Sequence, residues 1–130
     1  MASNLQFLNN VLLSKRALAN YNVDQNMHYN HLKPKQTQTL LSVMNDNDTL
    51  AIMPTGYGKT LIFELLPYLM QEKYGVKYCI IIASPLNAII QQQLERTPGH
   101  AVQITADFFE EDQDHDVEGM LMGKYKYVLL

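Results

Sequence analysis

The sequence lacks several features that mark common protein classes. Its single cysteine, Cys79, excludes an internal disulfide framework and a cysteine-rich zinc site. No apolar run approaches the length of a membrane span, and the longest, around Cys79–Ala83, has the length of a strand. The N-terminus has no charged segment followed by an apolar one, so no signal peptide is predicted. We therefore expect an intracellular protein with no membrane partner.

Charge is scarce and unevenly distributed. Charged residues make up 18% of the 130 residues, and the formal net charge of −3 argues against a purely electrostatic nucleic-acid binder. Residues 1–100 hold eight basic and six acidic residues, whereas residues 101–130 hold two and seven. All seven acids fall between Asp107 and Glu118. Such a run is typical of a solvated acidic loop, and phosphate binding is not expected there.

Isolated histidines and tyrosines give no further site. The four histidines lack the spacing of metal ligands, and the eight tyrosines are too dispersed to form a stacking platform for bases. Hydrophobic residues nevertheless make up 47% of the chain, which is enough for one domain with a buried core.

Hydrophobic periodicity predicts helices that alternate with strands. Helices are predicted over residues 3–20, from Pro34 to about Met44, from near Lys59 to a stop at Gly75, and over Leu86–Arg96. Strands are predicted over Thr49–Met53, Val76–Ala83, Ala101–Thr105 and Tyr125–Leu130. This alternation predicts an α/β fold with a parallel sheet and flanking helices, preceded by an N-terminal helix.

Several of these elements carry a predicted packing. The first helix is expected to dock through Leu5, Leu8, Val11 and Leu12. The helix after Lys59 is apolar on nearly every face and should be buried, with a kink at Pro67. The β-branched run Val76–Ala83 is typical of a strand covered on both faces. In the fourth helix, Leu86, Ile90 and Leu94 are aligned on one side.

The most specific motif is the segment Met53-Pro54-Thr55-Gly56-Tyr57-Gly58-Lys59-Thr60. It follows a predicted strand, opens a predicted helix, and matches the Walker A pattern except that Met53 occupies the position of the first glycine. Glycines let backbone N–H groups surround a phosphate at a helix N-terminus, where the dipole favours anions. Lys59 is then expected to reach the β and γ oxygens, and the hydroxyl of Thr60 to ligate Mg²⁺. The motif predicts a P-loop NTPase that binds ATP.

Together with Leu61-Ile62-Phe63-Glu64-Leu65, this segment resembles motif I of superfamily-two helicases, most closely those of the RecQ type. Leu32-Lys33-Pro34-Lys35-Gln36 is similar to motif 0 of that family, in which the glutamine reads the adenine edge. The segment from Ser84-Pro85-Leu86 to Gln93 is similar to motif Ia, which contacts the DNA backbone in the family. The resemblance thus implies adenine contact by Gln36, DNA contact by Ser84, Pro85 and Leu86, and a RecA-like lobe.

The chain also departs from the family pattern. Motif 0 usually has an aromatic residue and an arginine where this chain has Leu32 and Lys33, and lysine lacks a planar stacking surface. Motif II, an Asp-Glu-x-His segment that ends a strand, has no acceptable counterpart. The segment Asp112-Gln113-Asp114-His115 follows an acidic stretch and puts Gln113 where a carboxylate is needed. No catalytic residue is therefore predicted.

The resemblance implies an ATP-dependent 3′→5′ DNA helicase whose first RecA-like lobe is present in part, before motif II. We expect residues 1–30 to form a helical segment and residues 31–130 a partial ATP-binding domain, with the rest of the motor missing. If the source is eukaryotic, the family implies a nuclear location. Such a chain should bind ATP weakly without hydrolysing it, and should be partly molten or oligomeric.

Two alternatives remain at this point. The chain could be a short non-catalytic module that binds nucleotide, single-stranded DNA or a helicase partner. It could also be another P-loop NTPase, a GTPase or small kinase, although it has no Asn/Thr-Lys-x-Asp guanine motif.

Overall fold

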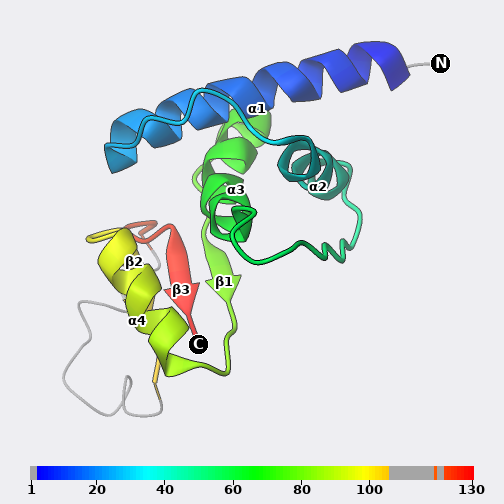
Figure 1. Ribbon diagram of the computed structural model, residues 1–130. Coiled ribbons are helices and arrows are strands. Elements are labelled where there is room, and N and C mark those ends of the chain that lie inside the picture. Colours follow the sequence, from blue (N-terminus) through cyan, green and yellow to red (C-terminus); the bar gives the residue numbers. More distant parts are fainter. Residues whose placement is uncertain (1–2, 106–118, 120–121) are drawn as a thin grey trace. The chain divides into compact units, whose positions relative to one another are not determined.

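The computed structural model describes residues 3–105, 119 and 122–130. The chain forms two compact units, Met1–Val76 and Lys77–Leu130, and each is described by itself. The first unit holds three helices: α1 (Ser3–Gln25), α2 (Pro34–Met44) and α3 (Lys59–Tyr74). The second holds β1 (Ile80–Ile82), α4 (Asn87–Arg96), β2 (Ala101–Gln103) and β3 (Tyr127–Leu129) (Figure 1).

Helices α2 and α3 form where the sequence predicts them. Pro34 is the first residue of α2, where its missing N–H costs no hydrogen bond, and Leu40 and Met44 are fully buried one helical turn apart. Helix α3 ends at Gly75, whose φ of 73° is left-handed and whose N–H donates to the carbonyl of Gln71 at 2.7 Å. Pro67 lies buried inside α3 and does not interrupt it.

Polar contacts join α1 to α3 inside the apolar core of the first unit and at its edge. The hydroxyl of Tyr21 donates to the carboxylate of Glu64, and neither side chain is exposed to solvent. The hydroxyl of Tyr68 donates to Asp24 at 2.5 Å and accepts from Gln25 at 2.9 Å. Burial, and then the hydrogen bond to Asp24, raise the pKa of Tyr68 well above its usual range, so this phenol stays a donor at physiological pH.

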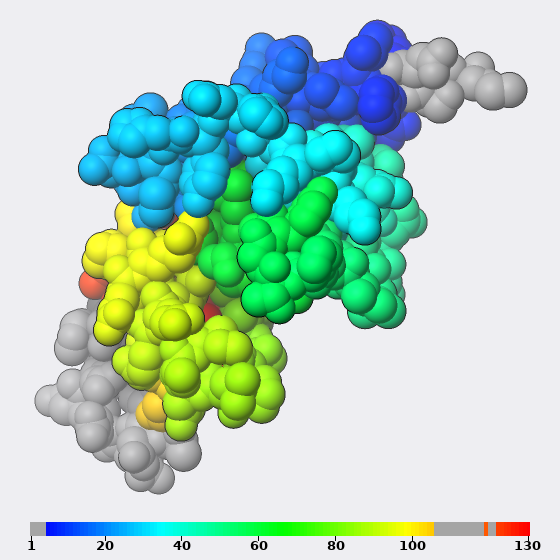
Figure 2. All heavy atoms as spheres, viewed as in Figure 1, coloured from blue at the N-terminus to red at the C-terminus, as the bar shows by residue number. Residues whose placement is uncertain are grey.

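The predicted docking face of α1 is wrong. Leu5, Leu8 and Leu12 are 78%, 64% and 48% exposed, and the first turns of α1 extend into solvent (Figure 2). The buried side of α1 instead carries Asn10, Ser14, Ala17, Leu18 and Tyr21. The polar members are accommodated because they are hydrogen-bonded, Asn10 to the side chain of Asn45 and Ser14 to the carbonyl of Val11. The helix also continues to Gln25, beyond the predicted end at residue 20.

The strand predicted at Thr49–Met53 is also wrong. This segment has no regular structure, and the described strands pair only with one another. Leu50 and Ile52 are 88% and 81% exposed, whereas Met53 at the end of the segment is buried. An apolar segment becomes a strand only when a neighbouring strand pairs with its backbone, and no described strand does so here.

The second unit confirms the parallel sheet. The strand order is β1-β3-β2, with both pairs parallel and with Tyr127 of β3 level with Ile80 and Ala101. The central strand β3 is buried throughout. Each strand is three residues long, shorter than predicted. Residue Ile81 of β1 is 68% exposed, so the prediction that this strand is covered on both faces is wrong.

Helix α4 begins one residue later than predicted, because Leu86 is its N-cap and is 57% exposed. Of the three aligned apolar residues, only Ile90 is buried, together with Gln93. The acidic run Asp107–Glu118 lies outside the described residues. Among the helices of the described part of the chain, none combines the length and apolar character that a membrane crossing requires.

The buried Tyr21–Glu64 hydrogen bond should stabilise the first unit. We expect Tyr21→Phe to lower the free energy of unfolding by about 1–3 kcal/mol, because it removes the donor and leaves the ring in place. Urea denaturation followed by circular dichroism measures this. The control is Tyr74→Phe, because the hydrogen bond from the Tyr74 hydroxyl to Asp46 is long, at 3.5 Å, and lies at an exposed site. An equal loss in both variants would contradict the role of the buried bond.

The exposed side chains of Leu50 and Ile52 should promote self-association of the 130-residue chain. We expect sedimentation velocity to show oligomers that the double substitution Leu50→Ser, Ile52→Ser shifts toward monomer. A control replaces Val23, which is 85% exposed but stands apart on α1, with serine. A wild-type chain that sediments as a monomer at every concentration would refute this prediction.

Candidate phosphate-binding site

The predicted phosphate-binding segment forms a largely exposed turn that leads directly into α3. Met53 anchors its start in the core, and Pro54, Thr55 and Gly56 are exposed. Gly56 and Gly58 have φ values of 83° and 101°, in the left-handed region that L side chains rarely adopt. The N–H of Tyr57 donates to the carbonyl of Pro54 at 3.2 Å and closes the turn. The two glycines are therefore required by the backbone path.

The N-terminus of α3 presents the chemistry that a phosphate requires. Gly58 is the N-cap residue, and no side chain of the described residues makes a capping hydrogen bond to the helix. The first amides of α3 thus lack the intrahelical and side-chain acceptors that would occupy them, at the positive end of the helix dipole. Lys59 is exposed at this end and Thr60 follows it in the first turn. Donor amides, an ammonium group and a hydroxyl together fit a triphosphate with a divalent cation.

The structure brings Gln36 to this loop. Its side chain is only 3% exposed, and its Nε2 donates to the carbonyl of Gly58 at 3.0 Å. Its Oε1 accepts from the backbone N–H of Lys33 at 2.8 Å. These two bonds use one donor and one acceptor of the amide, which leaves one N–H and one lone pair. Gln36 thus joins the start of α2 to the loop, and its predicted contact with adenine stays a prediction.

Lys33 and Tyr57 make contacts that the sequence did not predict. The Lys33 ammonium donates to the carbonyl of Tyr57 at 2.9 Å and lies 4.8 Å from the centre of its ring. The hydroxyl of Tyr57 accepts from the backbone N–H of Lys35 at 3.2 Å. An aromatic residue inside a glycine-rich loop was the available signal, but its partner lies 24 residues earlier in the chain.

The predicted nucleic-acid residues lie in the second unit. Ser84, Pro85 and Leu86 follow the carboxyl end of β1, the position at which parallel sheets commonly bind ligands. The hydroxyl of Ser84 accepts from the N–H of Leu86 at 3.3 Å, which shapes the turn into α4. Pro85 and Leu86 are exposed. Their side chains are accessible to a partner, and contact with DNA stays a prediction.

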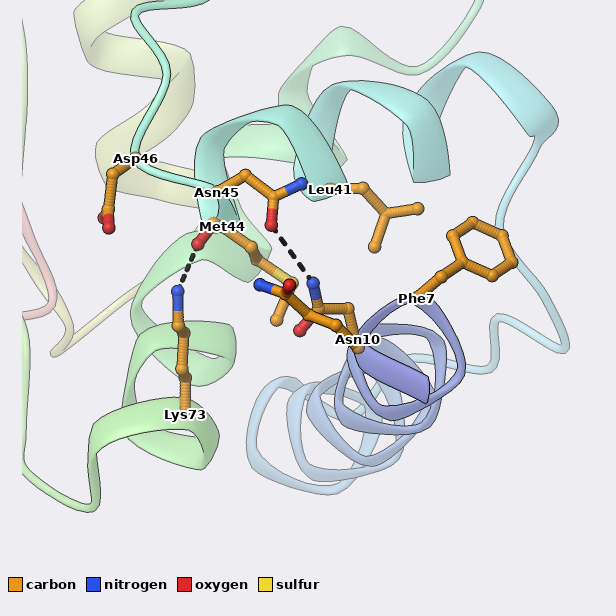
Figure 3. A pocket seen from close by; sticks show the side chains of 8 residues that line it. Phe7, Asn10, Leu41, Met44, Asn45, Asp46 and Lys73 are labelled. Atoms are coloured by element: carbon orange, nitrogen blue, oxygen red, sulfur yellow. Dashed lines mark hydrogen bonds between the residues drawn. The ribbon is translucent and has the colours of Figure 1, made fainter. Parts of the chain in front are cut away.

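A cavity elsewhere in the first unit is unrelated to this site. It has a volume of about 520 Å³ and lies between α1, the end of α2 and α3 (Figure 3). The Lys73 ammonium donates there to the carbonyl of Met44, and Asn10 donates to Asn45 at 3.3 Å. No residue of Met53–Thr60 lines it. Nor do the described residues group three or more metal-ligating side chains anywhere.

Substitution of the two loop glycines should separate backbone strain from the contact with Gln36. A Cβ on Gly58 would lie 2.5 Å from Nε2 of Gln36, whereas a Cβ on Gly56 would meet nothing within 4 Å. Since both residues have positive φ, each alanine should cost about 1–2 kcal/mol of backbone strain. We expect Gly58→Ala to cost about 1 kcal/mol more, because it displaces the Gln36 amide. Equal unfolding free energies of the two variants would contradict this contact.

Comparison with known proteins finds a family profile and curated relatives that match the chain. The sequence profile of the DEAD/DEAH box helicase family matches residues 33–123. The RecQ-like DNA helicase blm-1 of Caenorhabditis elegans is 34% identical over 65 residues, which is 50% of this chain and 6% of that protein. The probable ATP-dependent DNA helicase RecS of Bacillus subtilis (strain 168) is 28% identical over 68 residues, 52% of this chain and 12% of that protein.

No solved structure gives a significant match to the chain. The aligned region represents a small part of each of the two relatives, while the family profile extends across most of the chain. Its matched residues include the loop Met53–Thr60, Gln36 and the segment after β1. The chain therefore belongs to the DEAD/DEAH box helicase family and contains a RecQ-like ATP-binding region with a RecA-like parallel α/β fold.

Proposed function

We propose that this chain is the ATP-binding part of a RecQ-like, ATP-dependent 3′→5′ DNA helicase. One observation carries the proposal: two glycines with positive φ lead into an uncapped helix N-terminus at which Lys59 is exposed. Members of this family use ATP with a divalent metal, generally Mg²⁺. The similarity to a RecQ-like DNA helicase and to a probable ATP-dependent DNA helicase supports the choice of ATP and DNA as ligands.

Each residue of the loop has a proposed role. The backbone of Met53–Gly58 surrounds the phosphates, Lys59 neutralises the β and γ oxygens, and Thr60 ligates Mg²⁺. Gln36 uses its remaining N–H and lone pair for the adenine edge. Bound ATP would supply the phosphoryl group, and the protein's part is to orient it and to offset its charge.

The 130-residue chain alone should bind ATP weakly and should neither hydrolyse it nor unwind DNA. It contains no Asp-Glu-x-His segment, so it lacks the carboxylate that activates the attacking water in the family. We assign residues 31–130 to a partial ATP-binding domain and residues 1–30 to a helical segment that precedes it. The remainder of a motor would have to come from further sequence.

Single-stranded DNA is the second proposed ligand. Ser84 is partly exposed and Pro85 and Leu86 are exposed beyond β1, so this segment is accessible to a nucleic acid. A helicase of this kind works inside the cell, and in a eukaryote we place it in the nucleus.

The charge of Lys59 should decide whether ATP binds. We expect Lys59→Ala to weaken the binding of a fluorescent ATP analogue at least tenfold in the presence of Mg²⁺, because it removes a charge-assisted bond of about 1.5–3 kcal/mol. Titration of fluorescence anisotropy against protein concentration measures this affinity. The matched control is Lys15→Ala, which removes an exposed lysine of α1 from outside the loop.

Equal affinities of the wild type and Lys59→Ala would overturn the proposal. Competition distinguishes it from another P-loop NTPase, because unlabelled ATP should displace the probe and GTP should not. Displacement by GTP alone would favour the alternative of a GTPase.

A further inference from the structure

The phosphate-binding loop is fastened to the segment before α2 by more than Gln36. The Lys33 ammonium lies 2.9 Å from the carbonyl oxygen of Tyr57 and 4.8 Å from the centre of the Tyr57 ring. The Tyr57 hydroxyl accepts from the backbone N–H of Lys35 at 3.2 Å. A single loop residue is thus held at its carbonyl, at its ring and at its hydroxyl.

These contacts act on a segment with little structure of its own. Residues 54–58 form a turn between Met53 and α3, with left-handed glycines at positions 56 and 58 on either side of Tyr57. Glycine loses more conformational freedom on ordering than any other residue. When a loop becomes ordered only on ligand binding, the cost in conformational entropy lowers the affinity for the ligand. Contacts that order the loop beforehand reduce this cost.

The ammonium group of Lys33 therefore contacts the loop through Tyr57. In the family the corresponding residue is usually an arginine, whose plane can stack on a base. The compact ammonium of lysine is instead placed here between a carbonyl oxygen and an aromatic face, two groups that both attract a point charge. These contacts direct the ammonium toward the phosphate-binding loop.

We propose that Lys33 and Tyr57 form a clamp that holds the phosphate-binding loop in the conformation that receives a triphosphate. Both are positioning residues: Lys33 acts through the loop and not on the base. The proposal rests on the proposed function, because it concerns how tightly the same site binds ATP. It predicts that the clamp contributes equally to the binding of ATP and of inorganic tripolyphosphate, which has no base.

The test measures the affinity of the 130-residue chain for both probes by isothermal titration calorimetry with Mg²⁺. We expect Lys33→Met to weaken ATP and tripolyphosphate binding about five- to tenfold alike, since it removes the ammonium from the carbonyl and the ring. Lys33→Arg should restore most of the affinity because it keeps the charge and the donors. Lys35→Met is the control, because it removes a neighbouring charge and keeps the backbone N–H that binds Tyr57.

Tyr57 should show the same pattern. We expect Tyr57→Phe, which loses only the bond to Lys35, to weaken both probes about two- to threefold. Tyr57→Leu should weaken them about five- to tenfold, because the ring contact is lost as well. In the double variant Lys33→Met, Tyr57→Leu, the loss should be smaller than the product of the single losses, because the two residues share a contact. Melting temperatures should stay near that of the wild type.

Loss of ATP binding with unchanged tripolyphosphate binding would overturn the clamp and assign Lys33 to the base. If Lys33→Met and Lys35→Met lowered the affinity equally, the loss would reflect only the removal of a positive charge. This result would also overturn the clamp. If Lys59→Ala abolishes binding while every Lys33 and Tyr57 variant binds like the wild type, the clamp is wrong and the proposed function stands. A wild-type chain that binds neither probe would overturn both.

Discussion

The unpaired amides at the N-terminus of α3 are the constraint on which the first unit depends. A helix that begins at a left-handed glycine with no capping side chain leaves its first amides without an intrahelical or capping acceptor. Such a terminus can bind a phosphate only if the loop before it keeps its conformation and the helix behind it stays fixed. Gln36, Lys33 and Tyr57 act on the loop, and the buried contacts of α1 and α2 fix the helix. The apolar core of the first unit packs around α3 and holds it in place.

The core around α3 combines apolar packing with a few specific polar contacts. Leu65 and Leu69 of α3 are buried in the apolar core. Glu64, which directly precedes Leu65, is buried as well and accepts a hydrogen bond from the hydroxyl of Tyr21. A buried carboxylate requires a donor, so α1 must sit in one register along α3. This explains why α1 packs through Tyr21 and the small residues Ser14 and Ala17, and not through its leucines.

The sequence predicted those parts that local chemistry determines. The proline at the start of α2, the glycine at the end of α3 and the glycine-rich loop before α3 were sufficient to predict both helices and the turn between Met53 and α3. The face of α1 could not be predicted, because a stripe of leucines looked more apolar than the stripe around Tyr21, whose partner Glu64 is 43 residues away. The strand predicted at Thr49–Met53 was wrong for a related reason, because a strand forms only beside a neighbouring strand. The Lys33–Tyr57 contact is likewise tertiary.

The central claim is that the backbone from Gly56 to Thr60 binds the phosphates of ATP. Backbone amide chemical shifts of isotope-labelled protein, recorded during addition of Mg²⁺ and ATP, test it most directly. The account predicts saturable shifts that are largest for the amides of Gly56, Gly58, Lys59 and Thr60. It is contradicted if these amides stay unchanged while ATP binds, or if the shifts appear instead around the cavity lined by Phe7, Met44 and Lys73.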